Sequence, residues 1–131
     1  MLSKIGEKYG DLLYFVSRVL VGLLFLLHGV QKFTGGQPPT GLFLWAGIFE
    51  VLIGPAIILG LFTRLAALLG AIEMAVAYFM VHAPQGANPL ANKGEAAILN
   101  FTIFLVLLIY GARKWSIDEI LAKNAGLKKA L

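Results

Sequence analysis

Long apolar runs dominate the chain and predict membrane helices. Four stretches of about 18 to 21 residues are almost wholly apolar, at residues 11–31, 42–61, 64–83 and 95–112. A hydrocarbon core about 30 Å thick takes about 20 helical residues, so each stretch is long enough to cross it. The period-two alternation of a membrane barrel is missing. The pattern therefore predicts an all-α fold, a four-transmembrane-helix bundle with antiparallel, up-down connections.

Turn-forming segments separate these runs and leave one domain over residues 1–131. Thr-Gly-Gly-Gln-Pro-Pro follows the first run, Phe62-Thr63 the second, and Pro-Gln-Gly-Ala-Asn-Pro-Leu the third. In the remaining tail, residues 113–131, Ser116 and Glu119 have the spacing of a capping box. The tail is expected to form a short amphipathic helix at the membrane interface. A docking surface for a cytoplasmic partner is the alternative.

The distribution of positive charge predicts the topology. With four spans, both termini and the second turn lie on one side of the membrane. The basic residues on that side are Lys4, Lys8, Arg64, Arg113, Lys114, Lys123, Lys128 and Lys129. Only Lys32 and Lys93 lie on the other side. The positive-inside rule therefore places both termini in the cytoplasm, with the protein in the cell (inner) membrane. The net charge of +4 follows from this topology, and no nucleic-acid partner is expected.

Composition agrees with a membrane protein and excludes several chemistries. The chain is 59% hydrophobic, with a mean hydropathy of +0.82, which is more apolar surface than 131 residues of a soluble domain could bury. It contains no cysteine, so this chain cannot itself carry thiol–disulfide exchange or a thiolate metal site. His28 and His82 have no partner at a metal-binding spacing, so no metal is expected.

Ionisable residues inside the spans are the first candidates for function, because each costs about 2.5–3.5 kcal/mol on insertion. Arg18, Glu50 and Glu73 lie at similar predicted depths, counted at about 1.5 Å per residue. Small residues flank both glutamates, so both are expected on packing faces that point inward. Arg18 is expected to pair with one of them, which leaves the other acid without a counter-ion and able to hold a proton. A buried ion pair that only fixes helix register is the alternative.

A second polar layer is expected nearer the outer surface. His28 shares a helix face with Arg18, and Asn100 lies at a comparable height. Beneath the Pro/Gly-rich segment 83–94 these two residues outline a pocket for a small polar ring on a lipid tail. Lys32, by contrast, is expected to be an ordinary helix end that reaches the outer interface. His82 is expected to be interfacial, on the side of its helix opposite Glu73.

Several segments together resemble the DoxX-type membrane proteins. Residues 18–32, Arg-Val-Leu-Val-Gly-Leu-Leu-Phe-Leu-Leu-His-Gly-Val-Gln-Lys, are similar to the first helix of that family. Glu50, Gly54 and the segment Leu-Gly-Leu-Phe-Thr-Arg at 59–64 are similar to its second helix and turn. Glu-Ala-Ala at 95–97 and Gly-Ala-Arg-Lys-Trp-Ser-Ile-Asp at 111–118 are similar to its last helix and ending.

The resemblance implies a four-helix integral membrane protein of a bacterial or archaeal cell membrane. Members of the family include a subunit of an archaeal thiosulfate:quinone oxidoreductase. Another member is the membrane partner of superoxide dismutase and a sulfurtransferase in a mycobacterial complex. Because this chain has no cysteine, sulfur relay through its own thiol does not carry over.

The main functional hypothesis is a membrane subunit of a redox or oxidative-stress complex that binds a quinone-like lipid in the bundle core. Glu50 and Glu73 would exchange protons, and Arg18, His28 and Asn100 would bind the cofactor. Whether the chain is itself a quinone-linked oxidoreductase subunit stays open. Expected partners are membrane lipid and either other proteins or a second copy of the chain.

Two other hypotheses stay open. One is a non-enzymatic scaffold or assembly factor, in which Ala67, Ala71 and Ala75 form a small-residue stripe for a second copy. The other is a small-solute or proton transporter, for which an acid pair near the midplane is typical. The lack of clear inverted repeats or broken spans argues against transport.

Overall fold

The computed structural model describes residues 2–126 and is all-helical over them, which confirms the all-α part of the predicted fold. The helices are α1 (Leu2–Thr34), α2 (Gly41–Leu59), α3 (Thr63–Ala77), α4 (Glu95–Tyr110) and α5 (Ile117–Ala125). A π-helical turn, η1 (Tyr78–His82), and a 3₁₀ turn, η2 (Ala83–Gln85), continue α3. Strands do not occur within residues 2–126.

Three helical segments are long and apolar enough to cross a membrane: Lys4–Thr34, Gly41–Leu59 and Thr63–Gln85. The fourth expected span corresponds to α4, which is apolar but has only 16 residues and ends before the expected residue 112. Helix α1 begins well before the expected residue 11, because no proline precedes that position and the helix continues through Gly6 and Gly10. The four-span arrangement stays a prediction.

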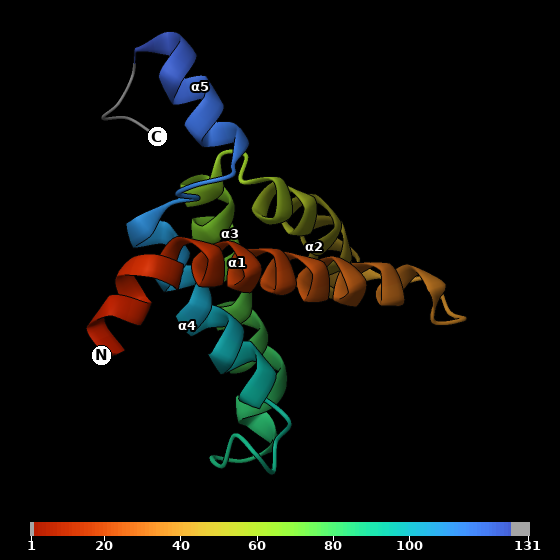
Figure 1. The fold of residues 1–131 in the computed structure, drawn as a ribbon. Coiled ribbons are helices and arrows are strands. Elements are labelled where there is room, and N and C mark those ends of the chain that lie inside the picture. Colours follow the sequence, from red (N-terminus) through yellow and green to blue (C-terminus); the bar gives the residue numbers. More distant parts are fainter. Residues whose placement is uncertain (1, 127–131) are drawn as a thin grey trace.

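The four long helices form two packed pairs, α1 with α2 and α3 with α4. In Figure 1, α1 runs across the view while α3 and α4 run down it, so the helices do not all share one direction. Phe25 of α1 and Phe104 of α4 join the pairs, with ring centroids 4.9 Å apart in an edge-on contact. Both rings are fully buried.

Glycines set the close approach within each pair, as the small residues beside the glutamates predicted. A Cβ on Gly54 of α2 would lie 2.7 Å from the backbone nitrogen of Leu26 on α1. A Cβ on Gly70 of α3 would lie 2.8 Å from the ring of Phe104 on α4. The expected stripe for a second copy is wrong for two of its members, since Ala67 and Ala71 are buried inside this chain.

The tail folds back onto the turn between α2 and α3. The side chain of Asp118 accepts hydrogen bonds from the backbone N–H groups of Phe62 (2.7 Å) and Thr63 (2.9 Å). Its own N–H donates to the carbonyl of Gly60 (2.9 Å). Phe62 has a left-handed backbone and offers α3 no side-chain cap, so Asp118 caps that helix from a distance in sequence.

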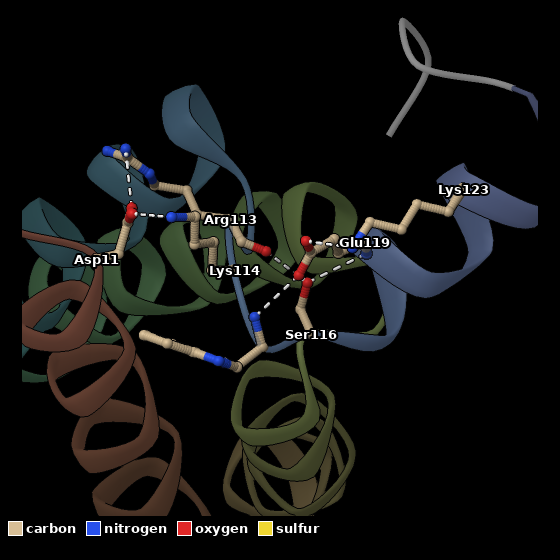
Figure 2. Close-up of polar contacts among 7 residues, drawn as sticks. Asp11, Arg113, Lys114, Ser116, Glu119 and Lys123 are labelled. Atoms are coloured by element: carbon tan, nitrogen blue, oxygen red, sulfur yellow. Dashed lines mark hydrogen bonds and ion pairs between the residues drawn. The ribbon is translucent and has the colours of Figure 1, made fainter.

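Helix α5 extends beyond this contact, away from the body of the protein (Figure 1). The predicted capping box is confirmed at its start, where Ser116 Oγ accepts from the N–H of Glu119 at 3.1 Å. The carboxylate of Glu119 reaches back to the N–H of Trp115 at 3.0 Å, one residue before the usual position (Figure 2). Lys128 and Lys129, two of the basic residues counted for the topology, lie outside the described residues.

Candidate functional site

A cavity of about 400 Å³ lies between the two helix pairs, and all four long helices line it. Most of the lining is apolar, including the rings of Phe43, Trp45 and Phe49 on α2. The polar lining residues are His28, Lys32, Glu50, Glu73, His82, Lys93 and Asn100. Four of the five predicted site residues therefore line one cavity, and the fifth, Arg18, does not.

Lys32 of α1 and Glu50 of α2 form an ion pair in the cavity wall. Glu50 is 3% exposed and Lys32 is 24% exposed. The expectation that Lys32 would only mark a helix end is wrong. Gly29 brings α1 so close to Glu50 that a Cβ there would lie 2.8 Å from the Cβ of Glu50. Lys32 lies almost one turn further along the same face, and its long side chain therefore reaches the carboxylate.

Arg18 pairs with neither glutamate, so the expected pairing is wrong. Its guanidinium is buried, and Nη2 donates to the carbonyl of Trp115 in the tail at 2.7 Å. The side chain reaches the α2–α3 turn, where a Cβ on Gly60 would lie 1.8 Å from Nη1. Similar depths along the chain did not bring Arg18 to a glutamate, because the helices are not parallel (Figure 1) and the long side chain points towards the tail.

Two further contacts at this end of the molecule hold the tail. The hydroxyl of Tyr14 donates to the carbonyl of Gly111 at 2.7 Å. Asp11 forms ion pairs with Arg113 at 3.2 Å and Lys114 at 2.7 Å, on the side of the tail opposite α5 (Figure 2). Sequence reasoning missed these contacts. The available signal was a polar residue, Asp11, and a tyrosine, Tyr14, at the start of the first span. Arg18, like Asp11, therefore holds the tail against α1.

Of the two glutamates that line the cavity, Glu73 is the one with no ion pair within residues 2–126. Both of its carboxyl oxygens are shielded from solvent, and neither has a hydrogen-bond partner among residues 2–126. Buried polar groups are nearly always hydrogen-bonded, because leaving one unsatisfied costs about 1–3 kcal/mol. The carboxyl of Glu73 is thus the part of the cavity lining that most needs a partner.

His28 and Asn100 also line the cavity, from α1 and α4. His28 is an exposed lining residue, and Asn100 is half-buried. Neither side chain forms a hydrogen bond within the described part of the chain. Their predicted role in binding a head group stays a prediction.

His82 lines the same cavity as Glu73, so its expected position on the opposite side of the helix is wrong. The expectation assumed a regular α-helix through residue 82. The structure instead has a π-helical turn at Tyr78–His82, and its wider winding rotates the last residues about the helix axis. The rotation brings His82 towards the cavity, where its Nδ1 lies 3.0 Å from the carbonyl oxygen of Asn92.

Asn92 organises the loop that follows, and sequence reasoning did not single it out. It is 1% exposed, its Nδ2 donates to the carbonyl of Gly86 (2.8 Å), and its Oδ1 accepts from the N–H of Gly94 (2.8 Å). The available signal was an asparagine among turn-forming residues, which often bonds to nearby backbone. Lys93 follows with a left-handed backbone, φ 60°, and its side chain lines the cavity.

Within residues 2–126, no three His, Asp or Glu side chains gather in a way that could hold a metal ion. The site as built offers hydrogen-bonding and proton-exchanging groups beside a large apolar surface. That combination suits an amphipathic organic ligand.

These features define an all-helical membrane protein with an amphipathic cavity between its helix pairs. The DoxX family model matches residues 13–83, just over half of the chain, and the chain belongs to the DoxX family. It is 39% identical over 125 residues to an uncharacterised protein of Haemophilus influenzae, covering 86% of this chain and 93% of that protein. It is 31% identical over 131 residues to an uncharacterised membrane protein of Mycobacterium tuberculosis, covering 82% and 80% respectively. No solved structure matches the chain.

Proposed function

We propose that the protein is a membrane subunit of a redox or oxidative-stress complex and binds a quinone-like lipid in the cavity. The observation that carries the proposal is the carboxyl of Glu73, which is shielded from solvent, unpartnered among the described residues and directed at an amphipathic cavity. A ring with polar oxygens would satisfy that carboxyl, and its tail would lie against apolar side chains.

The residues of the cavity have distinct proposed roles. Glu73 exchanges a hydrogen bond or a proton with a ring oxygen, and His28 and Asn100 hold the other polar edge. Glu50 forms an ion pair with Lys32 and keeps α1 and α2 together beside the ring. A bound quinone supplies redox chemistry that couples electrons to protons. Because this chain carries no cysteine and no cofactor-binding motif, a partner protein exchanges the electrons.

The proposal includes a topology. Helix α4 would be the fourth span, antiparallel to α3, with both termini on the cytoplasmic side of the cell membrane. The packing of α4 along α3 supports this topology. Basic residues are also more frequent near the two termini and the α2–α3 turn than on the opposite side. Its 16 residues rise about 24 Å, a length that a locally thinned bilayer accommodates.

Ligand-induced stabilisation of the purified protein tests the binding. Adding a short-tailed quinone should raise the midpoint of thermal unfolding of the wild type, since a ligand that binds only the folded state stabilises it. The Glu73→Gln variant should show a much smaller rise. Glu95→Gln is the matched control, because Glu95 lies at the start of α4 and does not line the cavity. Equal rises in all three proteins would refute the proposed role of Glu73.

A scaffold function is the second candidate, and the position of α5 favours it. Helix α5 extends away from the body and leaves Ile120 57% exposed. On this reading the helix docks a partner protein. Deleting residues 120–131, which leaves the cap by Asp118 in place, would then abolish assembly of the complex, whereas alanine at His28 and Asn100 would be tolerated.

A further inference from the structure

The loop between α3 and α4 contains a lysine, Lys93, whose backbone conformation is unusual. Lys93 has a left-handed backbone conformation, φ 60°, which is uncommon and costly for a residue with a side chain. Such conformations persist only where the surroundings impose them, and they gather at functional sites. Glycine would adopt the same conformation without cost.

Asn92 supports that conformation. Its buried side chain bonds to the backbone on both sides of the loop, at Gly86 and at Gly94, and so fixes the residues that flank Lys93. Gly94 packs against Tyr78 so closely that a Cβ there would lie 2.7 Å from the ring. The residues before and after Lys93, Asn92 and Gly94, are therefore both held by contacts within the protein.

The consequence is an ammonium group at the rim of the cavity. Lys93 is an exposed residue that lines the same cavity as Glu73. Within residues 2–126 it forms no ion pair with an acidic side chain, whereas the other lysine of the cavity, Lys32, is paired with Glu50. The lining thus presents an unpartnered carboxyl in its shielded part and an unneutralised cation at its rim.

We propose that Lys93 is a specificity-determining residue that selects ligands whose head group carries an anionic oxygen at the cavity rim. The inference deepens the proposed function and rests on it, since it assumes that a ring-bearing lipid occupies the cavity. An ammonium attracts a charged oxygen more strongly than a neutral carbonyl, because two opposite unit charges attract directly whereas the carbonyl offers only a dipole. Lys93 is exposed to water, so the expected preference is modest, about 3- to 10-fold.

The test compares two probes that differ in one group. One is a 3-alkyl-2-hydroxy-1,4-naphthoquinone, whose hydroxyl is ionised at neutral pH, and the other is the neutral 2-methyl analogue with the same alkyl tail. Affinities are measured by isothermal titration of the full chain in a non-ionic detergent. The quantity of interest is the ratio of the two affinities. Comparing this ratio between variants cancels the different partitioning of the probes into detergent.

The wild type and Lys93→Arg should favour the ionised probe, and Lys93→Gly and Lys93→Gln should reduce the ratio by about 3- to 10-fold. Lys93→Gly is the informative variant, because glycine suits the backbone at this position and the thermal unfolding midpoint should stay the same or rise. A loss of preference then cannot come from a damaged fold. An unchanged ratio in Lys93→Gly would overturn the inference.

Failure of the inference is distinguishable from failure of the proposed function. If both probes bind, Glu73→Gln weakens both, and the Lys93 variants leave the ratio unchanged, then only the inference is refuted. If neither probe binds the wild type, the proposed function and the inference fail together. If binding occurs but ignores Glu73 while it follows Lys93, the cavity rim is a separate anion site, and the proposed role of Glu73 is refuted.

Discussion

Lys32 on α1 and Glu50 on α2 form an ion pair in the wall of the cavity, and the glutamate is almost fully buried. The pair lies where Gly29 lets the two helices approach. It explains how an acid is tolerated in the middle of an apolar helix, because a buried charge needs a partner of opposite sign.

Removing one partner of this pair should therefore destabilise the protein. Lys32→Ala leaves the carboxylate of Glu50 buried without its cation, and the expected loss is about 2–4 kcal/mol in the free energy of unfolding, since breaking a buried pair costs about 3–5 kcal/mol and Lys32 is partly exposed. Reversible unfolding in mixed micelles measures it. The double variant Lys32→Met/Glu50→Gln should recover much of the loss. A double variant no more stable than Lys32→Ala would show that the charge is not the cause.

The cap that Asp118 places on α3 should be worth a measurable amount of stability. Asp118→Ala removes a charged acceptor from two backbone N–H groups, which leaves both donors unsatisfied at the α2–α3 turn. The expected loss is about 1–3 kcal/mol, since the side chain is also a charged cap at a helix N-terminus. Thermal unfolding measures the loss, with Glu7→Ala, an exposed acid far from the turn, as control. Equal midpoints for the two variants would contradict the capping role.

Gly54 should not tolerate a methyl group. Gly54→Ala would place Cβ 2.7 Å from the backbone of Leu26, and because backbone cannot move aside cheaply, α1 and α2 must separate. The expected cost is about 1–3 kcal/mol. Gly10→Ala is the matched control, because nothing lies within 4 Å of its Cβ and alanine favours the helix. A Gly54→Ala variant as stable as Gly10→Ala would contradict the close packing of the first pair.

Asn92 should matter for the loop between α3 and α4. Asn92→Ala removes the side-chain bonds to Gly86 and Gly94, so the segment keeps only its backbone bonds, such as that from the N–H of Gly94 to the carbonyl of Pro89 (3.0 Å). We expect a loss of about 1–2 kcal/mol in the free energy of unfolding and faster hydrogen exchange at Gly94. Asn88→Ala is the control, since the Asn88 side chain is exposed and accepts one local bond, from the N–H of Leu90. Unaltered exchange at Gly94 in Asn92→Ala would show that other contacts hold the loop.

Much of this fold was predictable from the sequence, because apolar length and turn residues report local structure directly. The helices, the turn at Phe62-Thr63, the small-residue packing faces and the Ser116 cap all follow from patterns within a few residues. One glutamate does lack an ion-pair partner among the described residues, but the count of two acids to one arginine named the wrong cation, since Lys32 and not Arg18 pairs with Glu50.

The errors arose where a contact joins distant segments or where the helix departs from regular winding. The choice of partners, Lys32 for Glu50 and the tail for Arg18, depends on how the helix pairs are oriented, which periodicity does not report. His82 was misplaced because the π-helical turn that it ends leaves no clear sequence signal. Asn92 was missed because its bonds form only once the loop is closed.

The central claim is that Glu73 holds the head group of a quinone-like lipid in the cavity. The most direct measurement is the amount of quinone extracted from the protein after purification from membranes in mild detergent, for the wild type and for Glu73→Gln. We expect close to one quinone-like lipid per wild-type chain. Glu73→Gln should carry several-fold less when equal amounts of folded protein are compared. Wild-type protein with no more quinone than the variant would contradict it.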